Sequence, residues 1–393
     1  MVIGIDASRA NAEQRTGTEW YSYHVIQGLK KLITVEHTVV LYSKEPLRGD
    51  LAQLPANWSS KVLGWSPKLL WTQLRLSWEM LLHRPDLLYI SAHTTPIIAP
   101  SNTVSVIHDV GFMRDVALYN DRAIGYKRSF ARSCINLCVR IVTFGRYGAT
   151  ERDYHSFALS LALKKSKKII TVSEFSKSEI HDVTHVPLER VTVIPNGLNI
   201  RDSYTDTKIF ANTGIQQPYL FFVGRIEEKK NSLRLIEAFA LLRERHGFNG
   251  QLVLAGSPGY GYDRIVQRMM ELGVREWVVE TGWVSENALG ALMHAAAVFV
   301  FPSLYEGFGI PVLEAMHLGV PVACSDIPPL REIASDAACF FDPLNPEKMA
   351  AAIANVLSES ARSIYAKKGM EQVKKFSWER TARETWNVLQ SLL

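Results

Sequence analysis

Short apolar runs rich in β-branched residues alternate with amphipathic helical patterns in both halves of the chain. This alternation predicts parallel sheets with crossover helices. The runs expected to form strands in the first half are 2–5, 38–42, 87–90, 103–108, 168–172 and 191–194. Those expected in the second half are 219–223, 251–255, 278–281, 298–301 and 320–323. The pattern therefore predicts an α/β protein with two doubly wound, Rossmann-like domains.

A polar, turn-rich stretch at residues 195–202 marks the expected boundary between these domains. We assign residues 1–199 to the first domain and 200–376 to the second. The tail, 377–393, begins with Ser377 as a helix N-cap and is amphipathic throughout. Because open α/β sheets bind ligands at the carboxyl ends of their strands, we expect the site in a cleft between the facing domains.

The strongest functional motif is a pair of glutamates, Glu306 and Glu314, separated by seven residues. The apolar run 298–301 leads into a glycine-rich turn, and an apolar helix start follows. Gly307 and Gly309 would allow the main chain to approach a ligand, and free amides at the helix start attract a diphosphate. The motif predicts a site for a polyol that carries phosphate. If the helix begins early, Glu314 lies more than two turns from Glu306 and meets another part of the ligand.

This frame resembles the retaining nucleotide-sugar glycosyltransferases of family 4, and the resemblance covers nearly the whole chain. It implies the GT-B architecture, in which the C-terminal helix crosses back onto the first domain. It also implies that Glu306 contacts the transferred hexose and that Glu314 holds the nucleotide ribose. The donor-binding residues implied at the turn between them are Gly307, Phe308, Gly309 and Ile310.

Basic residues follow the expected strand 219–223. Arg225 and Lys230 come after Gly224, where both side chains could reach one diphosphate. The resemblance assigns this pair to the donor diphosphate, whereas a solvated charged loop is the alternative. Asn231 is expected to cap the next helix.

The sequence contains no Asp-x-Asp pair of the kind that holds a divalent ion over the phosphates in many nucleotide-sugar transferases. Two cations and a helix start could stabilise the leaving group instead. We therefore expect neither a metal nor a cofactor. Cys134 and Cys138 share a helical spacing, with only the distant His155 as a further ligand type, so they are interpreted as buried apolar residues.

In the first domain, the apolar run 104–107 leads into His108 and Asp109. This order presents an imidazole at a strand end, with a carboxylate to orient it. The resemblance implies that His108 contacts an outer hydroxyl of the transferred sugar. Retaining transfer by a front-face path needs no strong enzyme base, because the departing phosphate can take the proton of the acceptor.

Three further segments are expected near the donor. Gly17 and Thr18, at a helix start, could offer amides to its phosphate. The resemblance places the backbone near Val284 against the base. The segment 256–261 is expected to be a flexible loop near the nucleotide. A Gly-x-Gly-x-x-Gly fingerprint is missing after the first strand, which argues against a dehydrogenase.

The N-terminus resembles a first strand rather than a secretion signal, and the apolar run 135–144 is too short and too interrupted to span a bilayer. The sequence therefore predicts a cytoplasmic protein. Residues 121–168 contain 11 Lys or Arg and three acids, whereas the whole chain has a net charge of +5. With the Trp-rich segment 65–78, this basic stretch predicts peripheral docking on the anionic inner face of the plasma membrane. No recognition motif accompanies the charge, which argues against nucleic acid binding.

The function predicted is retaining transfer of a hexose onto a glycan or lipid-linked glycan in the synthesis of cell-surface polysaccharide such as O-antigen. The pattern looks most like bacterial mannosyltransferases, which favours GDP-mannose as the donor. A UDP-sugar is the alternative donor. A nucleotide-sugar epimerase and a scaffold without catalytic activity are the other classes considered.

Overall fold

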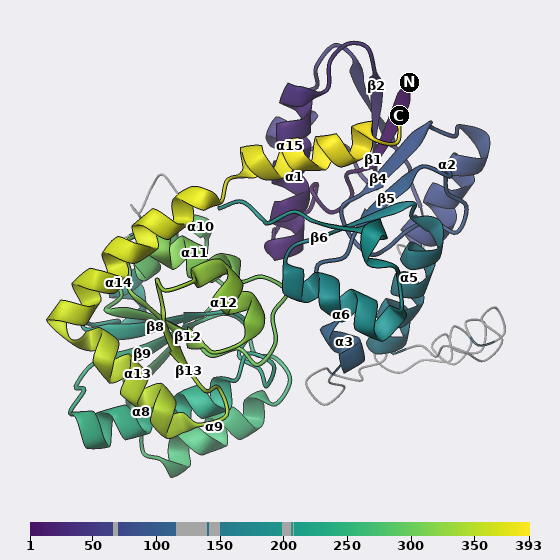
Figure 1. Cartoon of the computed structure of the whole chain (residues 1–393). Helices are drawn as coiled ribbons and strands as arrows, with labels where there is room; N and C mark the ends of the chain where they lie inside the picture. The colour runs from purple at the N-terminus through teal and green to yellow at the C-terminus, as the bar shows by residue number, and fades with distance from the viewer. Residues whose placement is uncertain (66–69, 115–139, 141–149, 199–205, 207) are drawn as a thin grey trace. The chain divides into compact units, whose positions relative to one another are not determined.

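The computed structural model describes residues 1–65, 70–114, 140, 150–198, 206 and 208–393 (Figure 1). The chain divides into two compact units. Unit 1 consists of Met1–Gly197 and Ser377–Leu393, and unit 2 consists of Leu198–Phe376. The boundary therefore lies two residues before the one expected from the sequence.

Unit 1 is built on a seven-stranded sheet in the order β3-β2-β1-β4-β5-β6-β7, and all of its pairings are parallel. The strands are β1 (Val2–Asp6), β2 (Thr38–Ser43), β3 (Trp58–Val62), β4 (Leu87–Ile90), β5 (Thr103–Val106), β6 (Lys168–Thr171) and β7 (Val191–Val193). Strands β4 and β5 are buried along their whole length, as expected for inner strands of a sheet covered on both faces.

The helices of unit 1 lie between these strands in the sequence, except for α15, which follows unit 2. They are α1 (Gly17–Leu32), η1 (Gly49–Ala52), η2 (Trp71–Leu76), α2 (Ser77–Leu82), α3 (Gly111–Arg114), α5 (Glu151–Lys165), α6 (Glu174–Thr184), η4 (Leu188–Arg190) and α15 (Trp378–Gln390). The last of these is the C-terminal helix, which crosses and packs against α1 (Figure 1).

Close packing fixes helix α15 on unit 1. A Cβ on Gly28 would lie 2.3 Å from the Cβ of Ala382, so the glycine allows the two helices to touch. The hydroxyl of Thr381 donates to the Pro195 carbonyl at 2.7 Å. Ser377 caps the helix by accepting from the Arg380 amide, as the sequence predicts.

Unit 2 is built on a six-stranded parallel sheet in the order β10-β9-β8-β11-β12-β13. Its strands are β8 (Tyr219–Val223), β9 (Gln251–Ala255), β10 (Val278–Gly282), β11 (Val298–Phe301), β12 (Val322–Ser325) and β13 (Cys339–Phe341). Its helices are α7 (Lys208–Thr213), α8 (Ser232–His246), α9 (Tyr262–Glu271), η5 (Arg275–Trp277), α10 (Glu286–His294), α11 (Ile310–His317), α12 (Pro328–Ala334), α13 (Pro346–Leu357), α14 (Glu359–Gln372) and η6 (Val373–Lys375). Helices α8, α9 and α13 enclose one apolar core with the sheet.

All eleven strands predicted from the sequence are present, and the two parallel sheets confirm the expected fold class. Two strands, β3 and β13, were missed. Both lie at sheet edges, where β3 has a single buried residue, Trp58, and β13 has only three residues. Several boundaries also differ by one or two residues, and the largest differences are at β5, which ends at Val106 instead of residue 108, and at β12, which spans Val322–Ser325 instead of residues 320–323.

Most of the basic stretch 121–168 lies outside the described residues, as do Cys134 and Cys138. Within the part of the chain that the structure describes, no helix combines the length and apolar character needed to cross a bilayer. The Trp-rich segment was expected to offer interfacial side chains, but Trp71 is buried and its indole donates to the Leu63 carbonyl at 2.7 Å. The prediction of an interfacial side chain is therefore wrong for Trp71, whereas Trp65 and Trp78 are exposed.

Candidate functional site

The glutamate motif lies at the junction between strand β11 and helix α11. The strand is buried, and the helix begins at Ile310, directly after Gly309. Gly309 has a φ of 120°, and a Cβ there would lie 2.7 Å from Leu330 Cδ2. Only glycine suits this position, and it brings no side chain to cap the first turn of α11. The glycine therefore lets this turn pack closely against α12.

An ion pair joins the two motifs that the sequence placed at the site. The Nζ of Lys230 lies 2.5 Å from the Oε1 of Glu306. Both side chains are mostly buried, with exposed fractions of 20% and 13%. Lys230 also lies over the ring of Phe301, 5.4 Å from its centroid. Strands β8 and β11 are neighbours in the sheet, so the loops after them meet.

The same two loops are joined by backbone and side-chain hydrogen bonds. The Leu304 amide donates to the Lys229 carbonyl at 3.0 Å. Asn231 occupies the N-cap position of α8 with a φ of 58°, yet its side chain does not cap the helix. Its amide instead donates to the carbonyls of Pro302 and Pro343, at 3.0 and 2.7 Å. The expected capping role is wrong, because the side-chain amide is turned toward these carbonyls and its Oδ1 accepts from Arg234 at 3.1 Å instead of from a backbone amide of the helix.

Arg225 differs from Lys230 in its surroundings. Its side chain is 62% exposed, and its Nε lies 3.6 Å from the carboxylate of Glu227. Both cations follow the carboxyl end of β8, but only Lys230 is held by Glu306. Arg225 is thus an exposed cation, whereas Lys230 is a mostly buried and paired one.

The glycine-rich segment 256–261 is not the flexible loop that was expected. It runs beside the segment after β8, where Ile226 donates to the Ser257 carbonyl at 3.0 Å and Glu228 to the Tyr260 carbonyl at 3.0 Å. A Cβ on Gly256 would lie 1.9 Å from the Gly224 carbonyl oxygen. The glycines therefore serve close backbone packing that supports the Arg225 loop.

Glu314 lies inside α11 and is 5% exposed. Helix α11 begins at Ile310, four residues after Glu306. The two glutamates are therefore not separated by more than two helical turns, which would have required a helix that begins near Glu306. Glu306 belongs to the loop and Glu314 to the helix. Phe308 is buried and packs edge-on against Phe376, with centroids 5.9 Å apart.

Val284 is half-buried in the turn between β10 and α10. The turn begins at Gly282, which has a φ of 67°, and ends at Ser285, whose hydroxyl accepts from the Ala288 amide at 3.3 Å. Trp283 is 58% exposed beside it. This segment follows an edge strand of the sheet and lies at the same carboxyl end as Arg225 and Glu306.

In unit 1, His108 follows β5 and is half-buried. Its Nε2 lies 3.1 Å from the Ser91 carbonyl oxygen, which can only accept, so Nε2 carries a proton and Nδ1 is the acceptor of the neutral ring. Burial lowers the pKa of His108, although the Ser91 carbonyl and Asp109 oppose this. Tyr21 packs edge-on against the ring at 4.8 Å.

Asp109 was expected to orient this imidazole. Its Oδ1 accepts from the Gly111 amide at 3.0 Å, which closes the turn into α3. The Ser91 carbonyl is the group that holds Nε2 of His108. The structure therefore gives Asp109 a turn-forming contact and gives the orienting contact to the backbone after β4.

Gly17 and Thr18 form the first turn of α1, where Gly17 is exposed. A Cβ on Gly17 would meet no atom within 4 Å, so the space beside it is open. Glu19 accepts from the Thr16 amide at 3.3 Å, and Arg9 donates to the same carboxylate group at 3.1 Å. The first turn of α1 therefore has an exposed backbone at Gly17, and the guanidinium of Arg9 is bound to Glu19 of the same turn.

Two further histidines were missed at this end of the unit 1 sheet. The Nε2 of His93, after β4, lies 2.9 Å from the Nδ1 of His155 in α5, and Phe112 packs against both rings. Burial lowers the pKa of His93 to about 3, with smaller contributions from His155 and Arg9. A signal did exist, since His93 follows its strand by three residues as His108 follows β5 by two.

No group of three His, Cys, Asp or Glu residues suited to a metal occurs among the residues that the structure describes.

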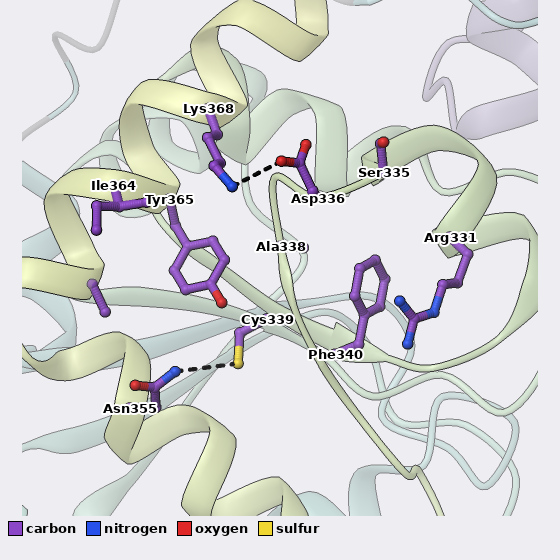
Figure 2. Close-up of a pocket in the computed structure, with 11 residues that line it drawn as sticks. Arg331, Ser335, Asp336, Ala338, Cys339, Phe340, Asn355, Ile364, Tyr365 and Lys368 are labelled. Carbon is purple, nitrogen blue, oxygen red and sulfur yellow. Dashed lines mark hydrogen bonds and ion pairs between the residues drawn. The ribbon is translucent and has the colours of Figure 1, made fainter.

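A hollow of about 850 Å³ lies elsewhere on unit 2, beside the edge strand β13 (Figure 2). Lys368 and Asp336 pair with each other at its rim, and Tyr365 and Phe340 stand on opposite sides. Arg331 lies over the Phe340 ring and forms two hydrogen bonds with Asp326. None of the residues expected at the donor site lines this hollow, so it is separate from the glutamate motif.

Comparison with known proteins identifies both halves of the chain. The family model for Glycosyltransferase Family 4 matches residues 15–202, and the model for Glycosyl transferases group 1 matches residues 205–374. The chain is 33% identical to O-antigen chain mannosyltransferase B of Escherichia coli over 264 residues, which are 65% of this chain and 68% of that protein. It is 29% identical to O-antigen chain mannosyltransferase RfbU of Salmonella typhimurium over 52% of this chain and 55% of that protein.

Solved structures share the fold at low sequence identity. WaaG, a glycosyltransferase involved in lipopolysaccharide biosynthesis, superposes with a TM-score of 0.70 at 18% identity over 99% of both chains. Sucrose-phosphate synthase from Thermosynechococcus elongatus gives a TM-score of 0.69 at 18% identity over 100% of this chain and 98% of that one. These neighbours, with the two parallel sheets, establish the GT-B fold class.

Proposed function

The chain belongs to glycosyltransferase family 4, and from that premise we propose that it transfers mannose from GDP-mannose to a glycan or lipid-linked glycan, with retention of the anomeric configuration. The observation that carries the proposal is the buried pair of Lys230 and Glu306 beside Gly309. It brings a cation for the diphosphate and a carboxylate for the sugar to one strand-to-helix junction.

The charges of this junction suit a leaving diphosphate. Lys230 is fixed by Glu306, and Arg225 follows the same strand with an exposed side chain. Both cations can stabilise negative charge that develops as the donor breaks, and preorganised groups of this kind supply large catalytic effects. We assign Glu314 to the ribose, and Gly307, Phe308 and Ile310 with Gly309 to the donor.

We propose a front-face reaction. The bond from the anomeric carbon to the diphosphate oxygen breaks, and the acceptor oxygen bonds to that carbon on the same face. The proton of the acceptor hydroxyl passes to the departing phosphate, so no separate base is required. His108 would offer Nδ1, as the acceptor of a neutral imidazole, to a sugar hydroxyl. Arg225 and Lys230 would replace a metal ion at the diphosphate.

The choice of donor is supported by the names of relatives. Two relatives of this chain are called O-antigen chain mannosyltransferases. A UDP-sugar is the alternative donor, because a structural neighbour from Anabaena is described in complex with UDP and glucose. We propose a role in O-antigen or related polysaccharide synthesis, at the inner face of the plasma membrane. The basic stretch 121–168 supports an anionic membrane as a partner.

Thermal shift measurements with GDP-mannose, UDP-glucose, GDP and UDP test the donor. A ligand that binds only the folded protein raises the Tm by mass action, so GDP-mannose should give the largest rise. Turnover with a mannosylated acceptor, followed by NMR of the anomeric proton, tests retention. A larger shift with UDP-glucose would overturn the donor assignment, and a β-linked product would overturn the mechanism. Loss of activity in chelator, restored by magnesium or manganese, would overturn the metal-free reaction.

A further inference from the structure

The hollow beside β13 has the surroundings of a binding site for an uncharged ligand that is rich in hydroxyl groups. Its volume of about 850 Å³ lies within the range of about 300–1,000 Å³ that is usual for small-molecule sites. Its walls come from β13, from α12 and the turn after it, from the end of α13 and from α14 (Figure 2). Because these walls are separate from the residues assigned to the donor, the hollow can hold a ligand of its own while the donor is bound.

Two aromatic rings belong to these walls. Tyr365 of α14 and Phe340 of β13 stand on opposite sides of the hollow (Figure 2). The guanidinium of Arg331 lies over the Phe340 ring, 4.2 Å from its centroid. The face of an aromatic ring carries partial negative charge, and a pyranose has a face of C–H groups with partial positive charge. Walls of this kind are suited to sugar rings.

The charged groups at the hollow are already paired. The Nζ of Lys368 lies 2.8 Å from the Oδ2 of Asp336. Arg331 forms two hydrogen bonds with Asp326, at 2.6 and 2.7 Å. The two pairs leave no net charge, whereas a phosphate or a nucleotide requires an unpaired cation. The side chains of Lys368 and Asp336 are 45% and 78% exposed, so they can donate to and accept from the hydroxyls of a neutral ligand.

A serine at the hollow has a backbone conformation that favours glycine. Ser335 follows α12 with a φ of 51° and a ψ of −122°. Among the residues that the structure describes, none forms a hydrogen bond with its hydroxyl. Residues held in such conformations cost folding free energy, and they cluster at ligand sites. Asn355 also lines the hollow, where its amide makes a long contact of 3.8 Å to the sulfur of Cys339. Both side chains are therefore available to a ligand.

We propose that this hollow binds a neutral oligosaccharide, and that its occupant is the growing glycan that the enzyme extends. The identity of the glycan rests on the proposed function, whereas the binding of sugar rests on the walls of the hollow. Leu330 and Ile333 of α12 lie against the turn at Gly309, and Arg331 of the same helix lines the hollow. One helix therefore contributes to both places. A glycan held in the hollow stays at a raised effective concentration at the enzyme, and long acceptors gain most from this.

Calorimetric titration of the full chain with an α-linked mannotetraose tests the binding. Tyr365→Ala removes one aromatic wall and should weaken affinity by about tenfold or more, whereas Tyr365→Phe keeps the ring and should stay within about threefold of wild type. Ser335→Gly should weaken affinity roughly threefold to tenfold, because one hydrogen bond is lost. The same change should raise the Tm, because glycine adopts this backbone conformation without strain. A serine with a role in folding alone would not lower affinity while it raises the Tm.

Acceptor kinetics give a second readout. Wild type should have a lower KM for mannotetraose than for methyl α-mannoside. Tyr365→Ala should raise the KM for mannotetraose alone, and kcat and GDP affinity should stay unchanged. The matched control is Gln267→Ala, which removes an exposed amide from α9 of unit 2 and should leave all of these quantities at their wild-type values.

Three outcomes decide between this proposal and others. Wild-type affinity for mannotetraose in both Tyr365→Ala and Ser335→Gly would overturn it, and Ser335→Gly carries the test if Tyr365→Ala does not fold. Binding of inorganic phosphate that is lost in Lys368→Gln would assign the hollow to an anion and overturn the proposal as well. Binding of maltotetraose in place of mannotetraose, lost in Tyr365→Ala, would support a glycan site in the hollow and overturn the mannose assignment instead.

Discussion

The loops that follow β11 in unit 2 and β5 in unit 1 both carry predicted site residues, but their electrostatics differ. After β11, Glu306 is charged and already paired with Lys230 at 2.5 Å. After β5, His108 is a half-buried imidazole whose pKa is lowered by burial. Its Nε2 is held by the Ser91 carbonyl at 3.1 Å. One strand end therefore carries fixed ions, and the other a neutral ring.

This difference suggests a division of tasks between the two units. A paired lysine and glutamate have already lost part of their hydration, so an incoming diphosphate competes for a cation that is held in place. A neutral imidazole offers one donor and one acceptor without a net charge, which suits a sugar hydroxyl. In this view, unit 2 handles the charge of the donor and unit 1 positions hydroxyl groups.

The largest expected effect is that of Glu306→Gln. The amide keeps the size of the side chain but removes the charge that pairs with Lys230. We expect kcat to fall by about a thousandfold or more, which corresponds to about 4 kcal/mol, while GDP binding stays within a few-fold of wild type. Steady-state kinetics and calorimetry with GDP measure the two quantities.

The matched control for Glu306→Gln is Glu347→Gln, which removes an exposed carboxylate paired with Arg245 on the surface of unit 2. It should leave turnover and GDP affinity unchanged. Near-normal turnover of Glu306→Gln would show that the charged pair after β11 has no role in transfer, and the contrast between the strand ends would lose its functional meaning.

The second prediction concerns the two cations after β8. Lys230→Ala and Arg225→Ala should each cost about 2–4 kcal/mol of transition-state stabilisation, the range for loss of one preorganised partner. Lys230 should be at the upper end, because its removal also leaves Glu306 without this cation in a mostly buried position. Comparison of kcat/KM for both variants gives these values. A larger loss for Arg225→Ala would mean that the exposed cation, instead of the paired one, carries the charge of the leaving group.

The sequence predicted most of the sheet structure for a simple physical reason. Inner strands such as β4 and β11 are continuous apolar runs, since both faces are covered. Strands β3 and β13 were missed because edge strands need less apolar character, and Trp58–Val62 exposes several positions. Their identity depends on a neighbouring strand that local pattern cannot show.

The site was predicted only in part, since its contacts are not local. Strand ends and glycines identified Glu306 and Lys230 separately, but their pairing depends on β8 and β11 being neighbours in the sheet. Asn231 looked like a helix cap because its position has the right residue type, while its side chain serves two distant carbonyls. His93 was missed because its partner, His155, lies 62 residues further along the chain.

The third prediction tests whether the charges of unit 2 act on separate parts of the donor. Glu314→Gln should weaken GDP affinity by about 2 kcal/mol, because hydrogen bonds from ribose hydroxyls to a charged acceptor are worth about 1.5–3 kcal/mol. The effect on kcat should be small. Calorimetry with GDP and with GMP measures it, and both ligands should lose affinity equally because both carry the ribose. A loss confined to GDP would place Glu314 at the diphosphate instead.

The smallest expected effect tests the charge of His93, at the carboxyl end of the unit 1 sheet. Burial lowers the pKa of His93 to about 3, while an unfolded histidine titrates near 6.5. Between these values the unfolded chain binds a proton that the folded chain does not, so stability is complete above about pH 6.5 and declines as the pH falls toward 3. From pH 7 to 5.5, wild type should lose about 1 kcal/mol of unfolding free energy relative to His93→Gln.

Urea unfolding at several pH values measures this difference. The control is His246→Gln, which replaces an exposed histidine at the end of α8. Parallel pH profiles for wild type and His93→Gln would show that folding does not lower the pKa of His93, and the neutral character assigned to this end of the unit 1 sheet would then be wrong.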